Sequence, residues 1–97
     1  MPEALAEANP PVAGEGAMVQ LSGLNSFDED SDTLTYSWTQ LAGSLVTLSD
    51  PTSSTPFFTA PLVGSAGEQL TFELTVSDGL ASDTATVHVV VVMAAPA

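Results

Sequence analysis

Lysine and arginine are absent from this sequence. Its 97 residues include twelve Asp and Glu and a single His, which gives a formal net charge of -12 at pH 7. Because cationic side chains neutralise phosphates, their absence excludes a nucleic-acid partner, and an anionic membrane surface would repel the chain. It also excludes a Lys Schiff base and an arginine clamp on a phosphate. The partners that remain are a metal cation, a neutral glycan, a basic protein surface or another copy of the chain.

Cysteine is absent as well, so neither a disulfide nor a thiolate zinc site can form. The first residues lack the basic and apolar regions of a signal peptide, so any export signal is expected elsewhere in a longer chain. The longest apolar stretch, residues 87–97, is far shorter than the ~20 residues that span a bilayer, and no membrane insertion is expected. Since bound cations or salt would relieve the self-repulsion of this acidic chain, we expect an extracellular or surface-exposed location, on a cell or a virion.

Apolar and polar residues alternate with period two along most of the chain, a pattern typical of strands that bury one face. The alternation predicts strands over residues 18–22, 33–39, 70–77 and 84–91, with shorter candidates at 46–49 and 56–60. A helical indication at residues 2–8 is too short to form a stable helix alone. Six or seven short strands separated by turn residues predict an all-β fold, an antiparallel immunoglobulin-like β-sandwich of about seven strands.

The predicted domain organisation is a single sandwich with short flanking segments. Residues 9–93 are assigned to the sandwich, residues 1–8 to an N-terminal linker or docking arm, and residues 94–97 to a C-terminal tail or linker. No internal repeat is present, so we expect a single structural unit.

Several apolar side chains are expected outside the core. Residues 89–92 are apolar on both faces of their strand, so Val90 and Val92 need cover from a loop, another domain or another subunit. Phe57 and Phe58 are adjacent, and one of them must face away from the core. Phe27, next to an acidic loop, is expected near the surface. These residues predict a packed interface with a partner.

Tyr36 and Trp38 share the alternation phase of Leu34, which is the predicted core face. Core packing is therefore favoured over a sugar-stacking platform.

Five segments resemble the PKD family of immunoglobulin-like domains, in the form common in microbial surface proteins. The more specific of them contain Tyr-x-Trp and Val-x-Asp-Gly, and the match covers residues 9 to about 92. The segments are Asn9-Pro10-Pro11-Val12-Ala13-Gly14, Val19-Gln20-Leu21-Ser22-Gly23, Leu34-Thr35-Tyr36-Ser37-Trp38-Thr39-Gln40, Phe58-Thr59-Ala60-Pro61 and Leu70-Thr71-Phe72-Glu73-Leu74-Thr75-Val76-Ser77-Asp78-Gly79. The resemblance implies a non-catalytic module that spaces, stiffens or presents other domains, and some such domains bind calcium. Similar domains also decorate phage capsids.

The best site candidate is the acidic loop of residues 28–32. Its alternate aspartates can turn successive carboxylates toward one hard cation, as calcium's six to eight oxygen ligands require. In an immunoglobulin-like sandwich this loop, the loop between the last two strands and the start of the first strand share one pole. The predicted calcium ligands are therefore Asp28, Asp30, Asp32, Asp78 and Asn9. A solvated acidic turn, another cation or a basic protein partner are the alternatives.

The aspartates of this loop match those of the family, whose loop reads roughly Ser-Ser-Asp-Pro-Asp-Gly-Asp. Glu29 and Ser31 replace the family's Pro and Gly.

Catalysis is not expected. Asp83 reads as a turn residue before the last strand, and His88 as a solvent-facing residue on a polar strand face. The sequence has no Gly-x-Ser-x-Gly nucleophile elbow, and its contiguous carboxylates lack a cleft for glycoside hydrolysis.

The sequence is thus consistent with three functions. The first is a structural or adhesive module of an extracellular or surface-exposed protein, stabilised by calcium at the acidic pole. The second is a self-assembling fibre or phage capsid-decoration subunit held by its terminal arms, which oligomeric state would distinguish. The third is a carbohydrate-binding accessory module of a secreted hydrolase, which would need a ring of exposed aromatic side chains.

Overall fold

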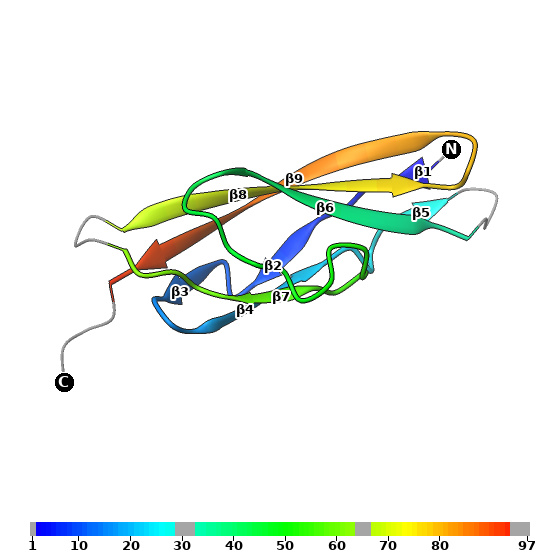
Figure 1. Cartoon of the computed structure of the whole chain (residues 1–97). Helices are drawn as coiled ribbons and strands as arrows, with labels where there is room; N and C mark the ends of the chain where they lie inside the picture. The colour runs from blue at the N-terminus through cyan, green and yellow to red at the C-terminus, as the bar shows by residue number, and fades with distance from the viewer. Residues whose placement is uncertain (1, 29–32, 64–66, 94–97) are drawn as a thin grey trace.

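The computed structural model of the chain describes residues 2–28, 33–63 and 67–93. Within these ranges it contains nine strands and no helix, and thus no helix able to cross a bilayer. The strands are β1 (Pro2–Glu3), β2 (Glu7–Asn9), β3 (Val12–Gly14), β4 (Met18–Ser22), β5 (Phe27–Asp28), β6 (Thr35–Ala42), β7 (Phe57–Thr59), β8 (Glu68–Ser77) and β9 (Ser82–Val92). They form two packed layers (Figure 1). The predicted all-β immunoglobulin-like sandwich is confirmed.

One layer is a four-stranded sheet of order β3-β9-β8-β6. β8 and β9 pair antiparallel without a register shift, from Glu68 opposite Val91 to Ser77 opposite Ser82. Apolar side chains at every second position of β8 point inward and are fully buried; they are Leu70, Phe72, Leu74 and Val76. We call this layer the long-strand layer, because β8 and β9 run along most of the molecule (Figure 1).

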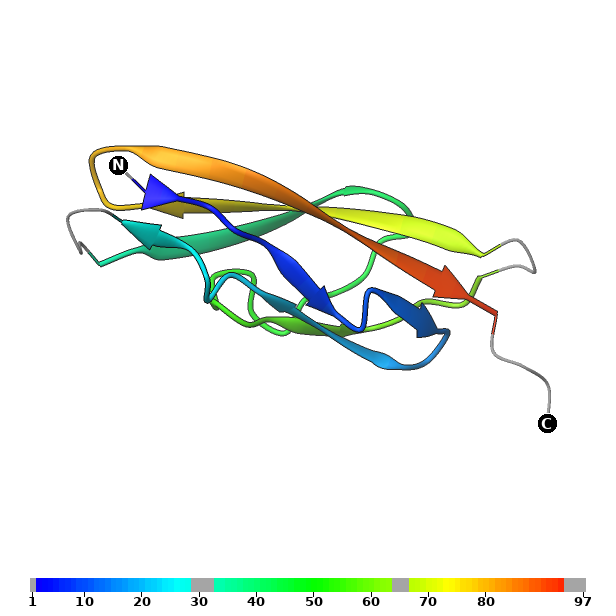
Figure 2. The same ribbon diagram turned by 180° about the vertical axis from the view of Figure 1, so that it is seen from behind.

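The other layer is built from shorter pieces, and we call it the broken layer. β2, β4 and β7 form a three-stranded sheet, and β1 pairs with β5 as a separate two-stranded sheet. β1 and β2 follow each other along one line, as do β4 and β5 along the neighbouring line (Figure 2). We call β1 and β2, with residues 4–6 between them, the first strand; its ladder is interrupted at residues 4–6.

The core between the layers is apolar. The rings of Phe58 from the broken layer and Phe72 from the long-strand layer lie 5.0 Å apart at an interplanar angle of 38°. Trp38 is 3% exposed, and Tyr36 is partly buried against the same core. The predicted core role of both residues is confirmed, because β6 turns its even-numbered side chains inward.

The sequence predicted an antiparallel sandwich, but one pair of strands departs from this prediction: β3 pairs with β9 in parallel. The chain keeps its direction between β2 and β3 while it passes from one layer to the other (Figure 2). β3 therefore runs alongside β9 in the same direction, with Val12 opposite Val90 and Gly14 opposite Val92.

Two other local predictions are wrong. Residues 46–49 do not form a strand: the Val46 N–H donates to the side chain of Gln40 at 3.0 Å, and only the Ser49 N–H bonds a neighbouring strand, at the Phe57 carbonyl. Residues 2–8, whose helical indication was judged too short to form a stable helix, contain β1 and most of β2. Ala4 is 6% exposed, so the described residues 2–8 are part of the sandwich and not a free linker or docking arm. Residues 94–97, the predicted tail, lie outside the described residues.

Candidate functional site at the acidic pole

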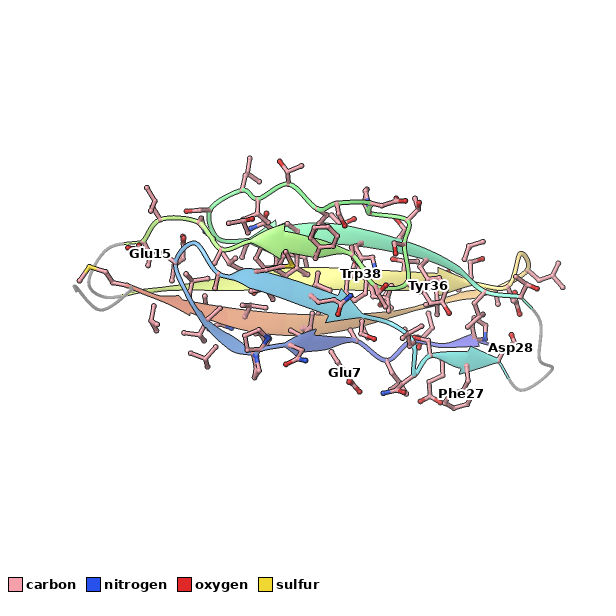
Figure 3. All side chains as sticks on the ribbon, turned by 90° about the horizontal axis from the view of Figure 1, so that it is seen from below. Glu7, Glu15, Phe27, Asp28, Tyr36 and Trp38 are labelled. Atoms are coloured by element: carbon pink, nitrogen blue, oxygen red, sulfur yellow. The ribbon has the colours of Figure 1, made fainter. Side chains whose placement is uncertain are left out.

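The candidate site lies at one end of the sandwich, which we call the acidic pole. Its described acidic residues are Glu3, Asp28, Asp78 and Asp83. The register places Pro2 opposite Asp28 and Ser77 opposite Ser82, so the first strand, β5 and the β8–β9 turn meet there. Asp28 and Phe27 are labelled at this end in Figure 3, with Glu15 at the other.

Asp78 organises the turn between β8 and β9. Its Oδ1 accepts the backbone N–H groups of Leu80 and Ala81, each at 2.8 Å, and its own N–H donates to the Ala81 carbonyl at 3.1 Å. The N–H of Ala81 and then that of Leu80 hold the pKa of Asp78 below its ordinary value, because they stabilise the carboxylate. A side-chain hydrogen bond with Asp28 lowers it further.

The structure brings together two of the five predicted calcium ligands, Asp28 and Asp78. Asp30 and Asp32 lie outside the described residues. Asn9 lies in β2, opposite Gln20 of β4. Asp28 lies opposite Pro2, which precedes Asn9 by seven residues in the chain. Because roughly 20 Å of nearly extended chain separates these positions, Asn9 is not brought to the acidic pole. Among the described residues, no three His, Cys, Asp or Glu side chains gather in a group that could hold a metal.

Two residues with a role at this pole were missed or misread from the sequence. Asp83 accepts the Ala4 N–H at 2.9 Å through Oδ2. Ser26 Oγ accepts the Leu5 N–H at 2.9 Å and donates to the Leu5 carbonyl at 3.2 Å. These side chains hold the first strand where its ladder is interrupted. The partners are 79 and 21 residues apart in sequence, so no local pattern indicates them.

At the opposite pole a single residue, Glu15, ties three segments together through its backbone N–H and its carboxylate. Glu15 donates its N–H to the Val92 carbonyl at 2.9 Å, and its Oε2 accepts the Val63 N–H at 2.9 Å. Large apolar side chains are exposed around these contacts; they are Met18, Leu62, Val92 and Met93. The two poles thus differ, one acidic and one mainly apolar.

The sequence model of one family, described as K319L-like, PKD domain, matches residues 6–91. This chain belongs to that PKD family. No curated protein matches it. Among solved structures it is similar to a nucleoside hydrolase-related hypothetical protein from Saccharophagus degradans that is associated with carbohydrate metabolism, with a TM-score of 0.69 and 24% identity. The match covers 96% of this chain and 25% of that one, and at this identity it shows the fold alone.

Few aromatic rings of the PKD domain are available to a ligand. Phe27 and Phe57 are exposed, whereas Phe58 is buried, as the adjacency of the two phenylalanines requires. Phe27 is opposite Glu3 and Phe57 opposite Gln20, so the exposed rings belong to separate sheets of the broken layer. Trp38 turns its Nε1–H to the Ser53 carbonyl at 2.9 Å, inside the fold. The two exposed rings therefore do not form a continuous platform.

His88 lies on the exposed outer face of the long-strand layer. Its Nδ1 is 3.0 Å from Thr71 Oγ1 on the neighbouring strand β8. Within the described residues no carboxylate hydrogen-bonds to the His88 ring, so the pair lacks there the orienting acid of a catalytic triad.

Proposed function

We propose that this PKD domain is a non-catalytic structural module that spaces or presents neighbouring domains in an extracellular or surface-exposed protein. One observation carries the proposal: β1 begins at the acidic pole and β9 ends at the opposite pole. The molecule measures 51 × 19 × 17 Å, so the two ends of the described chain are separated along its long axis (Figure 1). A domain with this shape holds whatever precedes and follows it apart.

The arrangement of β8 and β9 supports the same role. Tension between the two poles acts along the strands and loads the hydrogen bonds of the β8–β9 ladder together, over ten consecutive residue pairs. The absence of any cavity within the described ranges also fits a module that does no chemistry, since enzyme sites are concave.

The experiment that tests the spacer role places the domain between two folded reporter domains, each carrying one spin label. We expect a narrow distance distribution, because a rigid module fixes the separation. A Gly/Ser linker of equal length is the control, and it should give a broad distribution as a flexible coil does. An equally broad distribution with the folded PKD domain would contradict the proposal.

We further propose that calcium stabilises the acidic pole, as the family resemblance suggests. Asp28 and Asp78 would hold the ion, and their side-chain contact is the observation that supports it. Two carboxylates supply only part of the six to eight oxygen ligands that calcium takes. A cation bound only to the folded pole would raise the free energy of unfolding by linkage.

The test of calcium is a set of thermal melts with calcium, with EDTA, and with EDTA plus matched monovalent salt. We expect a calcium-specific rise in Tm of several degrees that Asp78→Asn abolishes. Asp50→Asn is the matched control, because Asp50 also caps a turn, through Thr52, but has no described acidic neighbour in hydrogen-bond contact. An equal rise with any salt would indicate general charge screening and would remove the calcium proposal.

A second candidate, a self-assembling or capsid-decorating subunit, is supported by the outer face near the end of β9. Val12 lies opposite Val90, Gly14 lies opposite Val92, and the valines are exposed. Sedimentation of the purified domain distinguishes the two functions. A stable oligomer that Val90→Thr dissociates would favour assembly, and a monomer at all concentrations would favour the spacer.

A further inference from the structure

We propose that the outer edge of β9, from Ser82 to His88, binds an extended basic peptide segment as an added β-strand. This inference concerns the side of the sandwich, between the poles, and is independent of the spacer role. Strand addition of this kind draws its affinity from main-chain hydrogen bonds at a sheet edge that has no partner strand.

β9 has a strand on both sides only near its end. β8 pairs with it along residues 82–91, but β3 pairs only with residues 90–92. On the β3 side, residues 82–89 pair with no strand within the described ranges. The first strand runs close by, but β1 and β2 belong to the other layer and pair with β5 and β4 (Figure 2).

The register identifies the backbone groups that face this edge. Val90 donates its N–H to the Pro11 carbonyl, and the Val92 carbonyl accepts the Glu15 N–H, so both residues turn their polar groups toward β3. The β8–β9 ladder has no register shift, and backbone direction alternates with period two along a strand. The N–H and C=O groups of Thr84, Thr86 and His88 therefore point to the same side.

No backbone or side-chain group of the described residues hydrogen-bonds to the N–H or C=O of Thr84, Thr86 or His88 on that side. The three side chains are exposed. The nearest polar contact from the first strand goes instead to a side chain, from the Ala4 N–H to Asp83 Oδ2.

Two other edges of the sandwich, those of β6 and β7, are covered by a loop. At β6, the Trp38 N–H donates to the Pro51 carbonyl. At β7, the Phe57 carbonyl accepts the Ser49 N–H, and the Phe57 N–H donates to Ser49 Oγ. The loop of residues 43–56 thus protects both edges. Residues 82–88 of β9 include no lysine, proline or bulge, and their one acidic side chain, Asp83, is bound to the Ala4 N–H.

The charge of the molecule selects the occupant. A net charge of -12 without a single Lys or Arg attracts a basic segment and repels a second copy of the chain. Glu73 lies opposite Thr86 on the outer face of the long-strand layer. Neighbouring strands are about 4.8 Å apart, so a Lys opposite Thr86 on the added strand would reach past the short Thr side chain toward Glu73.

The probe is an eight-residue peptide of alternating Thr and Lys with blocked ends, titrated into the domain at low salt. We expect binding, with the largest amide shifts in NMR spectra at Thr84, Thr86 and His88. The fully N-methylated peptide has the same charge but cannot form a β-ladder, and its affinity should be at least tenfold lower. Equal affinity of the two peptides would overturn the proposal, since charge alone would then explain binding.

The protein variant for this test is Thr86→Pro, which removes an N–H that faces the free edge. Proline is tolerated at such edge positions, and cooperative urea unfolding checks that the variant folds. We expect at least a tenfold loss of peptide affinity, whereas Thr86→Ala, which keeps the N–H, should change it less than threefold. Unchanged affinity in folded Thr86→Pro, no binding of the Thr/Lys peptide at millimolar concentration, or self-association abolished by Thr86→Pro would each overturn the proposal. The N-methylated peptide decides the question if that variant does not fold.

Discussion

The two layers of this PKD domain are held together in different ways. The long-strand layer is continuous: β8 and β9 pair over ten positions, and every second side chain of β8 from Leu70 to Val76 is buried. The broken layer consists of strands of two to five residues, and its first strand is interrupted at residues 4–6. Backbone ladders suffice for the first layer, whereas the second depends on individual side chains that satisfy backbone groups.

The difference shows where single substitutions act. In the long-strand layer a side chain contributes through apolar burial, which is large and distributed over the core. In the broken layer Ser26 and Asp83 contribute through one or two hydrogen bonds to the backbone of Leu5 and Ala4. Loss of such a bond lowers the free energy of unfolding less than loss of a buried apolar side chain does, but it leaves a specific backbone group without its partner.

The largest effect is expected from Phe72→Ala in β8. Phe72 is fully buried and packs its ring against Phe58, so truncation should lower the free energy of unfolding by about 3–5 kcal/mol. Urea denaturation measures it. Thr75→Ala, on the outer face of the same strand, is the control and should change stability by less than about 0.5 kcal/mol. A similar loss in both variants would mean that burial does not distinguish the two faces of this layer.

A second comparison uses two glycines with positive φ. Gly67 precedes β8 with φ 73°, and a Cβ there would lie 2.7 Å from the Val91 carbonyl oxygen; Gly16, between β3 and β4, has φ 82° and open space around it. Gly16→Ala should cost about 1–2 kcal/mol from backbone strain alone. Gly67→Ala should cost about 1–3 kcal/mol more, because it also overpacks the long-strand layer. Thermal denaturation of both variants checks this, and equal losses would show that the β8–β9 pair yields at that point.

A smaller and more local effect is expected from Ser26→Ala in the broken layer. The Leu5 N–H and C=O lose their partner, at a cost of about 1–3 kcal/mol. Hydrogen exchange of the Leu5 amide should accelerate, while that of β8 amides changes only with global stability. The control Ser77→Ala removes a Ser that bonds only the Gly79 N–H through Oγ and should leave Leu5 exchange unaffected. Unchanged Leu5 protection in Ser26→Ala would contradict the role of this serine.

The smallest expected effect is on the stability of the domain at acidic pH. The pKa of Asp78 is lowered in the folded protein by the N–H groups of Ala81 and Leu80. Between the folded and unfolded pKa values the unfolded chain binds more protons, so the contribution of Asp78 is complete above the unfolded value of about 3.9 and is lost as pH falls through the folded one. NMR titration of Asp78 should show the low pKa, and Asp78→Asn should remove this component of the acid dependence. A titration of Asp78 at or above the ordinary value would refute it.

Much of the long-strand layer was predictable. The alternation of Leu70, Phe72, Leu74 and Val76 with polar residues specifies strand, face and burial together, because strand side chains alternate strictly. The same rule predicted that one of Phe57 and Phe58 faces outward, and Phe57 does. The first strand was misjudged for the corresponding reason: its ladder is too short to produce a periodic pattern.

The site was predictable only in part. That Asp28 and Asp78 share a pole follows from the order of strands in an immunoglobulin-like sandwich, and the structure brings them together. Asn9 was placed there on the assumption that the first strand begins at residue 9. Because the strand already begins at Pro2, Asn9 lies well along the sandwich, opposite Gln20.

By itself the sequence determined the charge of -12, the expectation that partners needing cationic side chains do not bind, and the buried face of each long strand. These properties depend on composition or on neighbours two residues apart. Only the tertiary structure decided the passage of the chain between layers from β2 to β3, the meeting of Asp28 with Asp78, and the unpaired edge of β9. Each of these depends on contacts between segments far apart in the chain, which form when the two layers close over a common core.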